Sequence, residues 1–221
     1  MGPVLLARPW TALLVVSSVA WGCSGRSSHS STGTSVGSET AVTSSVDAAD
    51  ALRTFGADTQ AGVTASFGAV EAEVRKDPSA LRDAAIPLID APDPSVRFAA
   101  IYALSLTADN ASSRRALEPV LASGDVSERL LAAEAMLRGG DESALSVVID
   151  ALSNDSSMEL WEPPMPVWRF ARLMLLGATG LDFGLQSAQT LDDAVVAKRA
   201  WEHWWRTSGS TYQLPAAGPA S

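Results

Sequence analysis

The chain has very few of the residues that build covalent cross-links and most metal sites. Its 221 residues include one cysteine and two histidines. One cysteine cannot form an intrachain disulfide, and two histidines leave few ligands for a histidine-based metal site. Apolar residues make up 47% and charged residues 19% of the sequence. This composition excludes a disulfide-framework, collagen-like or wholly disordered protein and is ample for a packed core.

Positive charge is also scarce. The sequence has 16 lysines and arginines against 25 aspartates and glutamates, which gives a formal net charge of -9. Non-specific nucleic-acid binding depends on basic side chains that neutralise phosphates, so the acidic balance argues against a nucleic-acid partner. The length fits one modest domain or two small ones.

Motifs that carry chemistry are missing as well. The sequence contains no phosphate loop, dinucleotide fingerprint or nucleophile elbow. His29 and His203 each lack the second histidine at i+4 that a helical zinc site needs. The triplet 182–184 reads Asp-Phe-Gly but has no accompanying glycine-rich or catalytic loop of a kinase. We therefore predict no catalytic residue, no metal ligand and no cofactor.

The first residues have the pattern of an export signal. Arg8 precedes an apolar run over 10–21, which is shorter than the roughly 20 residues of a membrane span. The small residues Ala20 and Gly22 close the run, and Cys23 follows directly. The segment resembles a bacterial lipoprotein signal, with Ala20 and Trp21 at places where that pattern prefers Leu and a small residue. The resemblance implies that 1–22 is the signal peptide and that Cys23 becomes the lipidated N-terminus.

Two other interpretations of this segment stay open. Cleavage after Ala20 would leave a soluble secreted protein with a free thiol, and a lone cysteine can also be a small buried hydrophobe. Lipidation is favoured by residues 23–46, which are mostly Ser, Thr and Gly and have the composition of a flexible tether. By resemblance, Ser24 after the cysteine implies sorting to the outer membrane in a bacterium with two membranes.

The rest of the chain repeats itself. A shift of 32 positions superposes residues of the same type in the same order, which is the signature of a repeat architecture. The matched pairs are Arg82 and Arg114, Ala84 and Ala116, Pro87 and Pro119, Asp93 and Asp125, Ser95 and Ser127, Arg97 and Arg129, Ala100 and Ala132, and Ala103 and Ala135. A weaker third copy begins near 144, and an insertion at 163–166 displaces its second half.

Each copy has the pattern of a helix, a turn and a second helix. Asp93 and Asp125 stand where an N-cap carboxylate would accept backbone N–H bonds. The stretch 93–104 closely resembles the second-helix signature of HEAT repeats, in particular the short class first described in phycobilisome lyases. The copy from Asp125 fits less well, because Glu128 replaces the apolar Val96.

The resemblance covers 79–177 and implies an all-α fold, a short right-handed solenoid of antiparallel helix pairs. We expect an N-terminal helical cap at 47–78, a tryptophan-rich capping segment at 178–213 and a flexible tail at 214–221. Trp201, Trp204 and Trp205 share one helix face, which predicts that they cover the last hydrophobic surface. An aromatic binding patch is the alternative.

Five residues are candidates for contact with a partner. Trp161 stands beside two prolines in a predicted loop, and Trp168 begins the second helix of the third copy. Arg97, Arg129 and Arg169 recur at one point of each copy. They suit either a ladder of anion sites or, more simply, ion pairs to an acidic residue of the neighbouring repeat.

These observations predict a non-enzymatic lipoprotein at the cell envelope, anchored through lipid and binding protein partners through its repeats. It would face the periplasm, most simply from the outer membrane, with a soluble secreted form as the alternative. The second functional hypothesis is a lyase-like or enzyme-accessory HEAT protein that holds a small ligand in its concave face. A pocket lined by Trp168 and Arg172 would favour that hypothesis.

Overall fold

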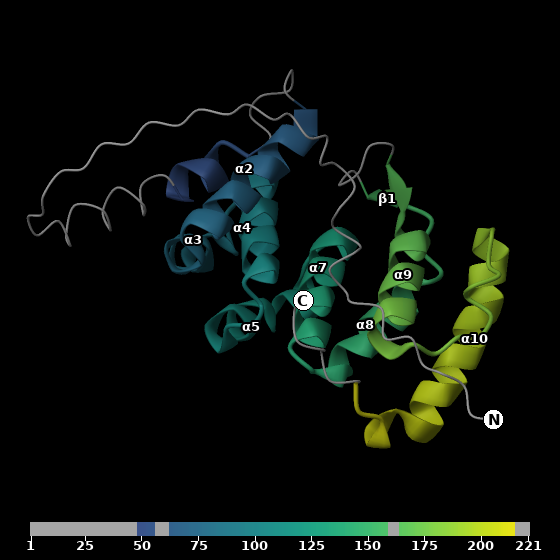
Figure 1. The fold of residues 1–221 in the computed structure, drawn as a ribbon. Helices are drawn as coiled ribbons and strands as arrows, with labels where there is room; N and C mark the ends of the chain where they lie inside the picture. Colours follow the sequence, from purple (N-terminus) through teal and green to yellow (C-terminus); the bar gives the residue numbers. More distant parts are fainter. Residues whose placement is uncertain (1–47, 56–61, 159–163, 215–221) are drawn as a thin grey trace, which may run out of the picture.

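The computed structural model describes residues 48–55, 62–158 and 164–214, and these are mostly helical (Figure 1). The prediction of an all-α fold is confirmed for these residues. Cys23, the tether and Trp161 lie outside them. Residues 48–53 are helical, and the α-helices that follow are α2 (Gly62–Lys76), α3 (Pro78–Ala85), α4 (Pro94–Leu106), α5 (Ala111–Leu117), α6 (Val120–Ser123), α7 (Val126–Arg138), α8 (Leu145–Ala151), α9 (Val167–Thr179) and α10 (Leu191–Ser208).

Aspartate caps start the helices where the sequence predicts them. Asp93 Oδ1 accepts the backbone N–H of Ser95 at 2.8 Å, and Pro94 occupies the first turn of α4. Asp125 Oδ1 accepts the N–H of Glu128 at 2.9 Å, while Glu128 Oε2 accepts the N–H of Asp125 at 3.2 Å. This reciprocal capping box satisfies two backbone donors that the start of a helix leaves without partners.

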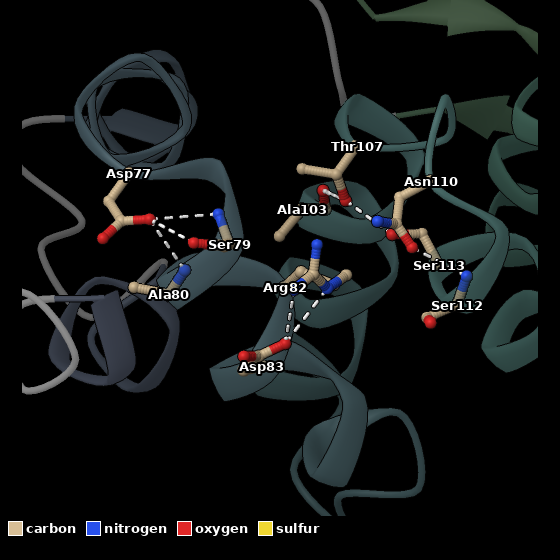
Figure 2. Close-up of polar contacts among 10 residues, drawn as sticks. All are labelled: Asp77, Ser79, Ala80, Arg82, Asp83, Ala103, Thr107, Asn110, Ser112 and Ser113. Atoms are coloured by element: carbon tan, nitrogen blue, oxygen red, sulfur yellow. Dashed lines mark hydrogen bonds and ion pairs between the residues drawn. The ribbon is translucent and has the colours of Figure 1, made fainter.

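Two of the shorter helices, α3 and α5, have the same kind of start (Figure 2). Asp77 Oδ1 accepts the N–H groups of Ser79 and Ala80 at the start of α3. Asn110 Oδ1 accepts the N–H of Ser112 at the start of α5. In α3 and α5 a polar residue therefore fixes the point at which the helix begins.

The two middle helices form the centre of the core. Every residue from Ala99 to Ser105 of α4 is buried. Small residues such as Ala100 and Ala103 of α4, and Ala132 and Ala135 of α7, are fully covered. Their size lets α4 and α7 lie against each other closely, and Figure 1 shows α2, α4, α7 and α9 succeeding one another across the molecule.

The repeats in sequence correspond to helix pairs in space. Helix α3 packs against α4, α5 and α6 pack against α7, and α8 packs against α9. At the N-terminal side, Phe67 of α2 places its ring 4.7 Å from Tyr102 and 6.2 Å from Phe98, edge to face in both cases. Helix α2 thus covers the outer side of α4, within the segment for which a cap is expected.

The insertion before α9 contains a short antiparallel ladder that the sequence did not predict. Strand β1 (Ser157–Met158) pairs with β2 (Met165–Pro166). Each strand has only two residues, too few for an alternation of polar and apolar side chains to be visible in the sequence. The base of the insertion is tied to α9, since Val167 donates its N–H to Ser156 O at 2.8 Å and Trp168 to Asn154 O at 3.0 Å.

Aromatic rings pack around the last helix. Helix α9 ends at Gly180, whose φ of +65° is the left-handed conformation that glycine adopts easily. Trp201 of α10 is 0% exposed and meets Phe183 edge to face at 4.9 Å. Trp204 lies 5.4 Å from Trp201 and 4.9 Å from Tyr212. Trp201 is part of the core, whereas Trp204 and Trp205 are half-buried at its edge.

Candidate binding surface

Arg97, the first of the three recurring arginines, forms an ion pair between helices. Its Nε donates to Glu128 Oε1 at 2.8 Å, and its Nη1 donates to Ala91 O at 3.0 Å. The Glu128 side chain is only 4% exposed. Arg97 therefore links α4 to the next long helix, α7, which is the simpler of the two roles the sequence left open. The same contact explains why a glutamate stands at position 128, where the preceding copy of the repeat has the apolar Val96.

Arg129 has no such partner. It is half-buried near the start of α7, and its Nε is covered without any hydrogen-bond acceptor. The sequence of the repeat also differs at the position that supplies the partner of Arg97. Glu128, which pairs with Arg97, directly precedes the next recurring arginine, and the residue that directly precedes Arg169 is Trp168. The position of the repeat that holds Glu128 in one copy therefore holds Trp168 in the next.

Arg169 is exposed and lies over that indole. Its Cζ is 5.2 Å from the centre of the Trp168 ring, within the range of a cation–π contact. Trp168 itself is only 3% exposed. This corrects the expectation that Trp168 contacts a partner, because the chain turns at the base of the insertion and places the indole inside. The structure thus brings Trp168 and Arg169 together. Arg97 is paired with Glu128 instead, so the three arginines do not form one row of anion sites.

Arg129 lines a groove between the start of α7 and the end of α8. The groove has a volume of about 510 Å³, and its polar wall includes Asp150, Asn154 and Asp155. Asp150 is also held at 3.4 Å by Lys198 Nζ of α10. The opposite wall is apolar and consists of Leu121, Val126, Val147 and Ala151. Sequence reasoning had singled out Arg129 but none of these other residues, since they come from three different segments.

A second hollow lies at the other end of α7. It has a volume of about 510 Å³ and is lined by Trp205, Asp141 and Glu142 together with glycines of the turn after α7. Asp141 Oδ1 already accepts the N–H and the hydroxyl of Ser143. Trp205 rests on Gly209, where an added Cβ would lie 2.3 Å from the ring. The polar groups here serve the turn, so this hollow is the weaker candidate.

Acidic and phenolic groups gather between α2, α4 and α7. Tyr102 donates its hydroxyl to Glu71 Oε1 at 2.9 Å, and burial, followed by this hydrogen bond, raises the pKa of Tyr102. On α7, burial raises the pKa of the Glu134 carboxyl above its ordinary value, and the Arg138 guanidinium offsets only part of the rise. Arg138 also donates from Nη2 to Ser105 O. Burial in this cluster therefore disfavours the charged form of Glu134.

Replacing Glu134 with glutamine is expected to raise the free energy of unfolding at pH 7. Because the folded-state pKa lies above the unfolded one, the native state binds this proton more tightly and the glutamate's contribution is most favourable at low pH. That contribution is lost as the pH rises through the folded-state pKa, where burial then penalises the charge. The advantage of E134Q should therefore shrink as the pH is lowered towards 4.

Urea unfolding of both proteins between pH 4 and pH 8 measures this effect. Glu118→Gln removes the same charge at an exposed position and corrects for the net negative charge of the chain. An E134Q stability gain that equals the E118Q gain at every pH would contradict the assignment.

The described residues hold no group of three or more His, Cys, Asp or Glu side chains placed to bind a metal ion. None of the described helices has the length and hydrophobicity to cross a membrane. Comparison of the chain with protein-family models, with curated proteins and with solved structures finds no match. The geometry of the Arg129 groove is thus the main guide to function.

Proposed function

We propose that the chain is an exported lipoprotein whose helix pairs form HEAT-like repeats and serve as a scaffold for protein partners. The observation that carries the proposal is the Arg129 groove, a mixed polar and apolar hollow of about 510 Å³ at the junction of two helix pairs. Its volume lies within the range of about 300–1,000 Å³ found for small-ligand pockets, so it could receive one or a few side chains of a partner. Repeat proteins bind partners along the surfaces that stacked helix pairs create.

The packing of the helix pairs supports the repeat part of this proposal. The long helices α4, α7 and α9 are each preceded by a shorter helix, and α7 packs against both α4 and α9. The ion pair from Arg97 to Glu128 joins one pair to the next. In a HEAT-like arrangement such contacts occur mainly between neighbouring repeats.

The alternative of a small-ligand site around Trp168 and Arg172 has less support. Trp168 is buried, and Arg172 Nη2 donates to Gln186 O at 2.9 Å. Neither residue lines the two hollows described above. We therefore keep the scaffold as the single proposed function.

Affinity capture from detergent-solubilised envelope fractions tests the scaffold. The full chain is the bait, and Arg129→Met is compared with Arg115→Met, which removes an exposed arginine of α5. We expect defined partners to be retained by the wild type and by R115M and to be reduced at least tenfold with R129M. Equal retention by all three proteins, or no partner above a bead control, would reject the proposed groove.

The lipid anchor has its own test in the substitution Cys23→Ala. The wild-type chain is expected to partition into the detergent phase, whereas C23A should move to the aqueous phase because it cannot be acylated. Ser24→Ala leaves the cysteine in place and should partition like the wild type. Unchanged partitioning of C23A would refute lipidation, and a wild type found in the aqueous phase would favour ordinary secretion.

A further inference from the structure

We propose that the hollow at the C-terminal end of α7 binds an arginine side chain of a protein partner, between the indole of Trp205 and the carboxylates of Asp141 and Glu142. The inference rests on the proposed scaffold function and deepens it, because it names a side chain that a partner presents. The site is separate from the Arg129 groove. Trp205 belongs to α10, and the two carboxylates belong to the turn that follows α7.

The charged side chains that line this hollow are all acidic. They are Asp141 and Glu142, and no lysine, arginine or histidine is among the described residues of the lining. The Arg114 guanidinium lies close to one edge, since a Cβ added to Gly139 would be 2.8 Å from its Nε, but its Nη1 already donates to Ala108 O. Two neighbouring carboxylates without a basic side chain in the lining favour a cation from outside the chain.

The carboxylates keep oxygens that can accept further hydrogen bonds. Asp141 accepts the N–H and the hydroxyl of Ser143 at 3.0 and 2.6 Å, both through Oδ1. Within the part of the chain that the structure describes, Oδ2 of Asp141 and the half-buried Glu142 carboxylate have no hydrogen-bond or ion-pair partner. Asp141 therefore holds the turn with one oxygen, and Glu142 is the carboxylate most open to a ligand. A guanidinium has five N–H donors to offer them.

Trp205 supplies the aromatic part of the hollow. It is half-buried, and Gly209 lies directly against its ring, since an added Cβ there would be 2.3 Å from Cε3. The ring of Trp204 lies 5.9 Å away. These contacts fix the indole in place, and tryptophan is the aromatic side chain that attracts cations most strongly. The chain makes such a contact itself in α9, where Arg169 Cζ lies 5.2 Å from the centre of the Trp168 ring.

This combination of groups favours arginine over lysine. A planar guanidinium can lie flat on an indole while the N–H groups at its edge donate to carboxylates, whereas an ammonium is a compact point charge. Arginine is also among the residues that contribute most to binding at protein interfaces. The hollow has a volume of about 510 Å³, which leaves room for the residues beside the arginine in the partner chain.

A peptide selection with the full chain tests the inference. The probe is a pool of N-acetylated, C-amidated heptapeptides with a central arginine and randomised uncharged residues around it. A matched pool has citrulline, the uncharged analogue of arginine, at the centre. We expect the immobilised wild type to retain the arginine pool at least about tenfold more than the citrulline pool. Glu142→Gln and Trp205→Leu should lose that preference, whereas Glu118→Gln, at an exposed position outside the hollow, should keep it.

Circular dichroism and urea unfolding establish that the variants are folded before retention is compared. Because E142Q keeps the shape of the side chain and removes only its charge, it decides the test if W205L does not fold. Equal retention of the arginine and citrulline pools would overturn the inference, and so would an unchanged preference in E142Q. A lysine pool retained as well as the arginine pool would overturn the assignment of arginine. The envelope capture tests the scaffold separately, so either proposal can fail alone.

Discussion

Trp201→Ala is expected to lower the free energy of unfolding by about 3–5 kcal/mol, the usual cost of removing a large aromatic side chain from a core. The indole is fully buried and contacts the rings of Phe183 and Trp204, at 4.9 and 5.4 Å. Truncation would remove these contacts and leave a cavity between α10 and the preceding loop. Urea unfolding at pH 7 measures the loss.

Trp201→Phe separates the role of the ring from that of the indole N–H. The Nε1 of Trp201 is buried without an acceptor, so phenylalanine would lose some contact area but also remove an unsatisfied donor. We expect this variant to lose less than half as much stability as W201A. If W201A were within about 1 kcal/mol of the wild type, typical of an exposed position, the burial of this helix face would be refuted.

Glu128→Ala is expected to lower the free energy of unfolding by about 3 kcal/mol, the second largest effect predicted here. Such a loss is usual when one partner of a buried ion pair is removed. Glu128 accepts the Arg97 Nε and the N–H of Asp125. The alanine variant would leave a half-buried guanidinium without its carboxylate and would remove half of the capping box. Helix α7 would lose a contact to α4 and part of its start at once.

A double-mutant cycle with Arg97→Met isolates the pair. We expect a coupling energy of about 1–3 kcal/mol between positions 97 and 128, typical of residues in direct contact. The matched control is the exposed pair Arg82 and Asp83, which lies at 2.9 Å but has a side-chain exposure of 69% at the aspartate. Its coupling should stay below about 1 kcal/mol. Equal coupling in both pairs would contradict the importance of burial at Glu128.

Local signals made the helices and their starts predictable. An aspartate followed by a proline or by a glutamate three residues later marks a helix start without knowledge of the fold, and Asp93 and Asp125 act as predicted. The 32-residue shift likewise places equivalent residues on equivalent helices. These features depend on contacts within one helical turn or on a repeat that is visible in the sequence itself.

Features that depend on distant contacts were not predictable in this way. From sequence alone Glu128 is a mismatch in the repeat, and only the structure shows that it pairs with Arg97. Trp168 reads as a contact residue until the turn at the base of the insertion places it inside. The raised pKa of Glu134 needs the burial that α7 receives from its neighbours, which one helix does not reveal. The groove combines segments around Arg129 and Asn154 that are far apart in sequence.

The interrupted repeat between α8 and α9 has a consequence for stoichiometry. A perfectly periodic protein offers the same site at every step, so a partner can settle at several positions and several copies can bind. Here the spacing between recurring arginines is 32 residues from Arg97 to Arg129 and 40 from Arg129 to Arg169. Of the three recurring arginines in the described residues, Arg129 alone lines this groove, so under the proposed function a complex through the groove should contain one partner per chain.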